Sequence, residues 1–305
     1  MNALEDIRPG ICANIAHALG CAPGDISALE PLGDGLTNSS YLFTAAGDAY
    51  VYRHPGEGTD AIINRESEAF SQEVARKLGL DGTFVFEDPR EGWKISRYVA
   101  GCRALDYGNW DEVAAALAMA RRLHGYPVAS PWEFDIYDET LKILGLLDAD
   151  AARGFPDFAE LAGRAAALDA VVKQGGSAKC LCHNDFYQPN FLVGDGCMHL
   201  IDWEYSGMGN YANDLGVFIC CSPYGLPEAR RVLQLYFQRP PTAEEERHCL
   251  ASVGLASFYW FVWALYKEAC GDPVGSWLQL WHDNAQVFGS EALSAGASAP
   301  GDGLR

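Results

Sequence analysis

The stretch that decides the fold is His183-Asn184-Asp185-Phe186-Tyr187-Gln188-Pro189-Asn190, which is followed by Leu200-Ile201-Asp202-Trp203-Glu204. Asp185 and Asn190 are separated by a fixed, short spacing on one loop, and Asp202 follows later. A carboxylate can position an attacking hydroxyl and take its proton, while an amide oxygen and a second carboxylate can hold Mg²⁺ against phosphate oxygens. The pattern therefore indicates a candidate site for proton transfer and metal binding, with a solvated polar loop as the alternative.

The residues between Asn190 and Asp202 are typical of a hairpin. Gly194-Asp195-Gly196 is a turn signal inside the strand-like segment Phe191–Leu200. Such a hairpin would return Asp202 to the side of Asn190. His183 is expected to support the loop through a hydrogen bond rather than to act as an acid or base.

The chain before the loop is expected to begin with a small β-rich lobe. A helix over residues 2–20 precedes the first strand. A second helix is expected at Asp60–Leu78 because its apolar residues share one face and Gly79 follows. Turn residues separate the strand candidates. These are Ile26–Leu32, Ser40–Thr44, Tyr50–Arg53, Thr83–Phe86 and Trp93–Tyr98.

Helical patterns dominate the chain after residue 100. They are expected at Trp110–His124, Phe134–Leu147, Asp157–Lys173, Glu228–Phe237, Glu244–Cys270 and Gly275–Phe288. The predicted class is α+β, with a small β-rich lobe over 1–100 and a larger helical lobe over 101–290. The Gly-, Ala- and Ser-rich segment 291–305 is expected to be a disordered tail.

Composition and charge set limits on the partners. The chain has 305 residues, which is enough for two lobes, and its net charge of −19 opposes binding to nucleic acid or to anionic lipid. Met1–Gly10 carries acids and no apolar core, and no run of 18 apolar residues occurs. We therefore expect a cytoplasmic protein with no membrane partner; a cationic substrate is favoured only weakly by the charge.

The ten cysteines do not follow a metal-binding or disulfide pattern. Cys180 and Cys182 are one residue apart, Cys220 and Cys221 are adjacent, and no Cys-x-x-Cys pair occurs. We expect reduced, buried thiols, and the spacing disfavours a zinc site.

Taken together, the His-Asn-Asp loop and Ile201-Asp202-Trp203-Glu204-Tyr205-Ser206-Gly207 resemble the kinase-like small-molecule phosphotransferases, most of all the choline/ethanolamine kinase family. The resemblance implies a two-lobe protein-kinase-like fold, ATP and Mg²⁺ as cofactors, and a small amine as substrate. It implies that Asp185 is the catalytic base and that Asn190 and Asp202 hold the metal. Asp214 would brace the catalytic loop; its alternative role is a helix N-cap.

The resemblance also assigns the nucleotide-binding residues. Arg53 would bind phosphate and needs an acidic partner, for which Glu68 is the match and Glu66 the alternative. A surface charge pair is the other interpretation. The remaining residues are in the phosphate-covering loop and in the adenine-binding hinge. They are Gly33, Gly35, Thr37 and Asn38 in the loop, and Tyr98 and Val99 in the hinge.

The substrate is expected at an aromatic stretch in the late helix Glu244–Cys270. Trp260 and Trp263 are three residues apart and so lie on one side of a helix. Aromatic faces bind a quaternary ammonium, which has no N–H to donate. The resemblance makes these tryptophans the walls of a choline pocket, with Glu204 and Tyr205 beside them. The alternative role for the tryptophans is core packing. The alternative functions are a kinase that acts on ethanolamine, another amino alcohol or an aminoglycoside, and a catalytically silent nucleotide-binding regulator.

Overall fold

The structure is a computed structural model that describes residues 3–34, 38–56, 63–148, 151–194 and 196–297. The chain divides into two compact units, and each is described by itself. The first unit comprises 1–103 and 192–205, and the second comprises 104–191 and 206–305. The segment 192–205 therefore belongs to the first unit, although it lies far along the chain. The sequence did not predict this return.

The first unit is built on a five-stranded antiparallel sheet in the order β1-β2-β3-β5-β4. Its strands are β1 (Ile26–Asp34), β2 (Asn38–Ala45), β3 (Asp48–Pro55), β4 (Phe84–Glu87) and β5 (Lys94–Arg97). The five predicted strands are confirmed, each with one or both ends shifted by one or two residues. The short helix η1 (Pro23–Asp25) leads into β1.

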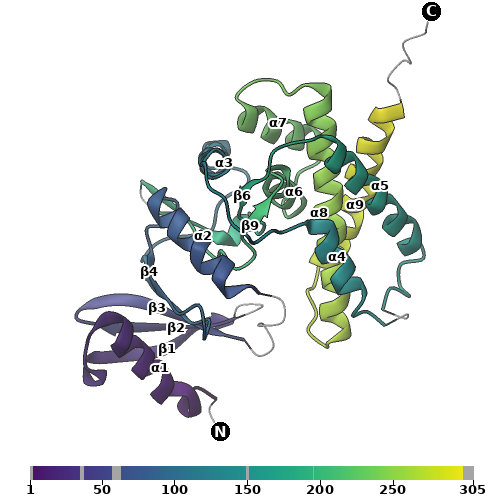
Figure 1. The fold of residues 1–305 in the computed structure, drawn as a ribbon. Coiled ribbons are helices and arrows are strands. Elements are labelled where there is room, and N and C mark those ends of the chain that lie inside the picture. The colour runs from purple at the N-terminus through teal and green to yellow at the C-terminus, as the bar shows by residue number, and fades with distance from the viewer. Residues whose placement is uncertain (1–2, 35–37, 57–62, 149–150, 195, 298–305) are drawn as a thin grey trace, which may run out of the picture. The chain divides into compact units, whose positions relative to one another are not determined.

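Alternation along β3 gives the sheet of the first unit two different faces. Tyr52 is buried in the apolar core that α1 (Ala3–Leu19) forms with the strands, where its hydroxyl accepts a hydrogen bond from Asn14. Arg53, the next residue, faces the other way and meets α2 (Arg65–Lys77). Helices α1 and α2 lie on opposite sides of the sheet (Figure 1), so α1 covers its apolar face and α2 covers its charged face.

Helix α2 begins later than the sequence predicted. Its N-cap is Asn64, whose side chain accepts the backbone N–H of Ser67 at 3.0 Å. An N-cap has non-helical backbone, so the predicted start at Asp60 is wrong. Residues 57–62 lie outside the described part of the chain.

The hairpin after the catalytic loop is present. Its strands are β7 (Phe191–Gly194) and β8 (Cys197–Leu200). Backbone hydrogen bonds join Arg103 to Val193 and Leu200 to Leu80, so the hairpin packs with the first unit. The last residues of that segment, including Asp202, therefore belong to the β-rich unit.

The second unit is mainly helical. Its helices are α3 (Trp110–His124), α4 (Ile136–Leu144), α5 (Phe158–Gln174), α6 (Ala212–Cys220), α7 (Leu226–Phe237), α8 (Ala243–Ala269) and α9 (Trp277–Ala297). A two-stranded sheet of β6 (Cys180–Cys182) and β9 (Gly207–Gly209) flanks the catalytic loop, which contains the short helix η3 (Gln188–Asn190).

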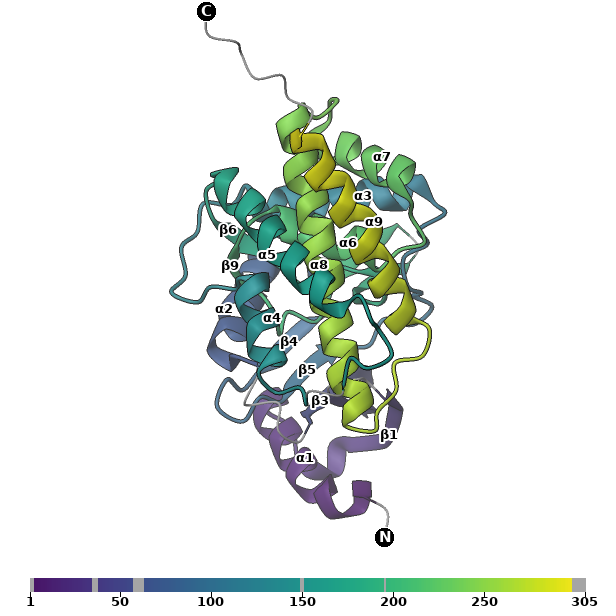
Figure 2. The same ribbon diagram turned by 90° about the vertical axis from the view of Figure 1, so that its right-hand side faces the viewer.

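Helix α8 is the centre of the second unit, with α5, α6 and α9 packed around it (Figure 2). Every residue from His248 to Leu265 is buried. Its most apolar 18-residue window has a mean hydropathy of 1.5, which would be enough to cross a membrane, but 94% of that window is buried inside the protein. Burial on all sides identifies α8 as the core helix of a globular unit.

Three features of the second unit differ from expectation. Strands β6 and β9 are too short to show a period, and α6 is short and buried on every side, so these elements gave no clear pattern. The third is the expected tail over 291–305, which is wrong for its first part because α9 continues to Ala297. Residues 298–305 lie outside the described part of the chain.

Candidate active site

The catalytic loop holds Asp185 and Asn190 together in the second unit. The Asn190 side-chain nitrogen donates to the Asp185 carboxylate at 2.7 Å and to the Asp185 backbone carbonyl at 2.8 Å. Both bonds use the amide nitrogen, which leaves the amide oxygen to act as an acceptor or a metal ligand. The side chains are buried to 8% and 6% exposure, so the pair is preorganised rather than solvated. These contacts exclude the alternative of a freely solvated polar loop.

His183 lies at the start of this loop and is fully buried. Its ring nitrogen Nδ1 accepts the backbone N–H of Asp185 at 3.2 Å. Its ring also packs edge-on against Phe186, with the ring centroids 6.2 Å apart. Both contacts hold the loop backbone, as a supporting role requires.

Asp214, in the first turn of α6, accepts hydrogen bonds from the backbone of the catalytic loop. Its carboxylate accepts the N–H groups of His183 at 3.0 Å and Asn184 at 2.7 Å, and it accepts a third hydrogen bond from His124 Nε2 at 2.8 Å. Burial opposes ionisation of Asp214, but the hydrogen bond and charge of His124, with help from His183, lower its pKa. Asp214 therefore fixes the backbone on which Asp185 stands, and it is not the N-cap of α6, which is Tyr211.

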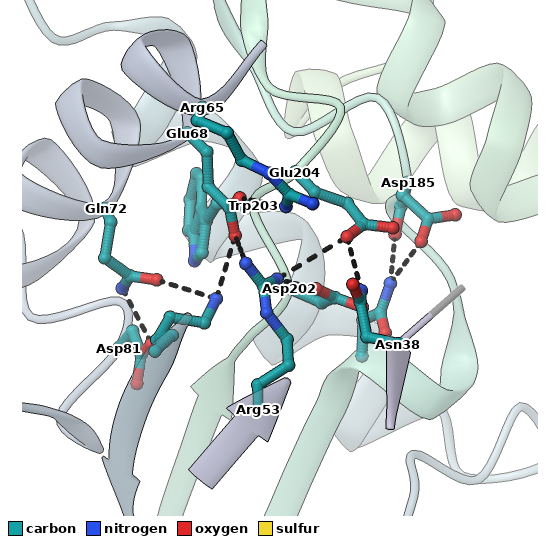
Figure 3. Close-up of polar contacts among 12 residues, drawn as sticks. Asn38, Arg53, Arg65, Glu68, Gln72, Asp81, Asp185, Asp202, Trp203 and Glu204 are labelled. Carbon is teal, nitrogen blue, oxygen red and sulfur yellow. Dashed lines mark hydrogen bonds and ion pairs between the residues drawn. The ribbon is translucent and has the colours of Figure 1, made fainter. Parts of the chain in front are cut away.

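Arg53 is the centre of a buried charge network in the first unit (Figure 3). Its guanidinium pairs with Glu68 at 2.5 Å, and Glu68 also pairs with Lys94 at 3.1 Å and Arg65 at 3.2 Å. Glu66 is exposed, whereas Glu68 is completely buried. The acidic partner of Arg53 is therefore Glu68, and the surface-pair interpretation is excluded.

Asp202 and Glu204 join the same network from the segment that returns to the first unit. Asp202 lies 3.0 Å from Arg53, and Glu204 lies 3.5 Å from it and accepts a hydrogen bond from Asn38 at 2.7 Å. The Asp202 side chain remains 35% exposed, so its carboxylate can bind a further group. Its backbone φ of 67° is in the left-handed region, which aspartate enters more readily than most residues.

Burial and charge divide the acids of this network into two kinds. Burial opposes ionisation of Glu68, but the charges of Lys94, Arg53 and Arg65 outweigh it and lower the pKa of Glu68 to about 2. Burial raises the pKa of Glu204 to about 7, and the Asp202 carboxylate adds to the effect. Three cations, Arg53, Lys94 and Arg65, meet around Glu68 on this face of the sheet, and such a cluster of positive charge is suited to binding phosphate.

Part of the predicted nucleotide site lies outside the described residues, namely Gly35 and Thr37. Gly33 is the penultimate residue of β1, and Asn38 begins β2, so the two flank that loop. Tyr98 and Val99 directly follow β5, and the Tyr98 side chain is 39% exposed. Tyr205 is half-buried at the end of the first unit.

Trp260 and Trp263 belong to an aromatic cluster that sequence reasoning found only in part. Their ring centroids are 5.5 Å apart, and Trp260 stacks on Trp281 of α9 at 5.7 Å. Trp281 stacks on Trp277 at 5.1 Å, and Trp277 meets the ring of Tyr187 at 6.5 Å. Tyr187 is in the catalytic loop, so the cluster connects the predicted pocket walls to that loop within one unit.

A cavity in the second unit lies away from this cluster. It has a volume of about 340 Å³ and is lined by residues that include Phe134, Asp135, Lys173 and Asn210. Neither Asp185 nor the four tryptophans line it. Its lining includes both acidic and basic side chains, such as Asp135 and Lys173, and volume alone does not identify it as the substrate site.

Three further residues of the site were not predicted. Lys94 and Arg65 share Glu68 with Arg53, and His124 holds Asp214. A lysine inside the otherwise apolar segment Trp93–Ile95 is a usable signal for a buried ion pair, because lysine is almost never buried alone.

A buried cation on a sheet, braced by a helix glutamate, and a separate loop with paired aspartate and asparagine are the two parts of a kinase-like phosphotransferase. The phosphotransferase enzyme family (APH) matches residues 28–249. The chain belongs to this family.

The similar proteins include choline kinases. Protein LicA from Haemophilus influenzae is 26% identical over 257 residues, which cover 80% of this chain and 74% of that protein. The crystal structure of the choline kinase LicA from Streptococcus pneumoniae superposes with a TM-score of 0.76 at 24% identity, covering 96% of this chain and 100% of that one. A choline/ethanolamine kinase family protein from Mesorhizobium loti gives 0.69 at 24% identity, covering 95% and 96%.

Proposed function

We propose that this protein is an ATP-dependent kinase that transfers the γ-phosphoryl group to the hydroxyl of choline and releases phosphocholine and ADP. Asp185 orients the hydroxyl and accepts its proton while the oxygen attacks phosphorus. Asp214 and His183 hold the loop so that this carboxylate starts in position. Positioning and charge stabilisation supply most of the rate enhancement in this chemistry.

The observation that carries the choice of substrate is the aromatic link within the second unit. Tyr187, two residues from Asp185, contacts Trp277, and the stacked rings continue to Trp281 and Trp260. A cation held on these faces would lie within reach of the catalytic loop. Choline carries its hydroxyl only two carbons from its ammonium, so one pocket can hold the cation while the base meets the hydroxyl. The similarity to LicA proteins supports this substrate.

The nucleotide is assigned to the first unit. Arg53 and Lys94 offer positive charge to the non-transferred phosphates, with Glu68 as their brace. Gly33, Gly35, Thr37 and Asn38 would cover the phosphates, and the backbone of Tyr98 and Val99 would bind adenine. A structure of LicA in complex with AMP, 25% identical with a TM-score of 0.71, supports a nucleotide in this fold.

The donor atoms available for a metal suit Mg²⁺. The Asn190 amide oxygen is not used by the bonds to Asp185, and the Asp202 carboxylate is partly exposed. Both are hard oxygen ligands of the kind that Mg²⁺ prefers. Asn190 and Asp202 would hold the ion, which neutralises charge on the phosphate oxygens when bound. Convergence of Asp202 with Asp185 and Asn190 stays a prediction, as does a cytoplasmic location.

Glu204 and Tyr205 are proposed to complete the substrate site. In the described structure the Glu204 carboxylate is bound by Asn38 and Arg53. A substrate ammonium would compete with Arg53 for this carboxylate. Glu204 is therefore proposed to link the charge of the substrate to the phosphate-binding cation.

A substrate panel tests the proposal. The purified protein is supplied with Mg·ATP and with choline, ethanolamine or an aminoglycoside, ADP is detected by a coupled assay, and the product is identified by phosphorus NMR. We expect the highest kcat/KM with choline and phosphocholine as the product. A higher kcat/KM with ethanolamine or an aminoglycoside would show that choline is not the preferred substrate. The absence of a phosphorylated product with all three compounds would favour a silent nucleotide-binding regulator.

A further inference from the structure

A cluster of soft donor atoms lies directly upstream of the catalytic loop. Cys180 and Cys182 are on the same side of β6, and their sulfur atoms are 3.7 Å apart. Together with a ring nitrogen of His124, at the end of α3, these atoms all lie within 4.8 Å of one another. Among the described residues, these are the three histidine, cysteine or acidic side chains that come together closely enough to hold an ion.

The spacing fits a tetrahedral ion better than a disulfide. A disulfide needs its sulfur atoms about 2.05 Å apart. Two thiolates that bind zinc at about 2.3 Å in tetrahedral geometry lie roughly 3.8 Å apart, close to the 3.7 Å that separates Cys180 from Cys182. The Asn210 carbonyl, 3.3 Å from the Cys182 sulfur, is next to the cluster and, like a water molecule, can supply a fourth ligand.

His124 is already oriented as a metal ligand would be. Its Nε2 is 2.8 Å from the Asp214 carboxylate, which can only accept a hydrogen bond from it. With this proton on Nε2, the neutral ring presents a lone pair at Nδ1, which lies 2.8 Å from the Tyr236 hydroxyl. A carboxylate behind a ligating imidazole is the usual second partner of a zinc-bound histidine. Displacing one hydroxyl hydrogen bond would complete the ligand set.

The charges also balance. Zn²⁺ displaces one proton from each thiol, the protons leave to solvent, and the two thiolates cancel the charge of the ion.

We propose that Cys180, Cys182 and His124 form a binding site for a thiophilic divalent metal ion, and that this ion is Zn²⁺. The site shares its histidine with Asp214, which holds the backbone of His183 and Asn184. An ion bound here would be linked through one side chain to the loop that carries Asp185. Its binding does not depend on the proposed kinase activity.

The chain contains a matched control. Cys220 and Cys221 in and after α6 are also close, with sulfur atoms 3.8 Å apart. In the described part of the chain no third donor of these types joins them. Cys270 is an exposed thiol and controls for adventitious binding at the surface.

The full-length protein, reduced and freed of metal, is titrated with Co²⁺ and with Zn²⁺ in a large excess of Mg²⁺, which occupies oxygen-ligand sites. We expect one ion per chain, a thiolate-to-cobalt charge-transfer band, and displacement of cobalt by zinc. Cys180→Ser, Cys182→Ser and His124→Asn should each weaken binding by at least about tenfold. Cys220→Ser, Cys221→Ser and Cys270→Ser should bind like the wild type.

Three results would overturn the proposal. One is the absence of a charge-transfer band in the wild-type protein, whatever the variants do. The second is an unchanged zinc stoichiometry and affinity in Cys180→Ser, a near-isosteric change at a side chain that is only partly buried. Loss of binding in Cys270→Ser would likewise assign the ion to the surface.

Discussion

The Asp214 carboxylate accepts the backbone N–H of Asn184 at 2.7 Å, across a sequence separation of 30 residues. Asn184 has a φ of 64°, a left-handed conformation that asparagine adopts more readily than most residues. The bond thus holds a turn that directs the chain from β6 into the catalytic loop. The position of Asp185 depends on this contact as well as on its own side-chain partners.

Replacing Asp214 by asparagine should weaken the hydrogen bonds that hold the catalytic loop against α6. Asparagine carries one acceptor oxygen where three donors converge, and its N–H₂ would face at least one of them. Loss of one or two charge-assisted hydrogen bonds, at about 1.5–3 kcal/mol each, should lower kcat about tenfold to a hundredfold, with a smaller change in KM for ATP. Steady-state kinetics and the thermal midpoint measure both effects.

Asp111 is the control for this change, because it is exposed in the first turn of α3. Asp111→Asn should change stability by no more than about 0.5 kcal/mol and leave kcat unaltered. Wild-type kcat in Asp214→Asn would show that the brace has no part in turnover.

Asp185→Ala should remove turnover and spare nucleotide binding. The carboxylate is the proposed proton acceptor, and general base catalysis contributes about 10²–10⁴-fold. The charge network around Arg53 is in the other unit and does not need Asp185 to fold. Turnover is measured by ADP release and ATP affinity by calorimetry. Near-normal turnover would exclude Asp185 as the base.

Glu68→Gln and Glu66→Gln form a matched pair on α2. Glu68 is buried among Arg53, Lys94 and Arg65, and Glu66 is exposed. Breaking a buried ion pair leaves uncompensated charge and costs about 3–5 kcal/mol. We expect Glu68→Gln to lower the free energy of unfolding by this amount and to raise KM for ATP, whereas Glu66→Gln should behave as wild type. Equal effects of the two changes would contradict the assignment of Glu68 as the brace.

The lowered pKa of Glu68 also predicts that the free energy of unfolding decreases at acidic pH. The pKa of Glu68 is lowered to about 2 from an ordinary value of 4.5. Above pH 4.5 both states are ionised and the contribution is complete. Between pH 4.5 and about 2 the unfolded chain binds a proton that the folded protein does not, so stability falls with pH. Urea unfolding of wild type and Glu68→Gln should show a gap that narrows over this interval; a constant gap would contradict the lowered pKa.

How much of this could be predicted from the sequence depends on how each feature is encoded. Asp185, Asn190 and the Arg53–Glu68 pair could be predicted because the motif spacing is local. Lys94 could not, because its role depends on β5 pairing beside β3, which places it directly across from Arg53. The return of 192–205 to the first unit is also a long-range feature. It depends on backbone hydrogen bonds such as the one from Leu200 to Leu80, which no side-chain pattern in the sequence indicates.

The aromatic cluster shows the same limit. Trp260 and Trp263 could be placed on one side of a helix from their spacing, but their stacking on α9 depends on how two helices pack. The tail was misjudged for a related reason. Alanine, the best helix former, makes a small-residue segment helical when the preceding turns are already packed, and α9 runs to Ala297.

Trp263→Ala tests the substrate site most directly. Trp263 is 8% exposed and packs edge-on against Trp260 and Trp281. A cation–π contact is worth about 0.5–2 kcal/mol, so its loss should raise KM for choline roughly 2- to 30-fold. KM for ATP should hardly change, because the nucleotide is assigned to the other unit. Trp263→Phe keeps an aromatic face and should fall between wild type and alanine. If both variants raise the two KM values alike and lower the thermal midpoint alike, Trp263 is a core residue and the choline pocket lies elsewhere.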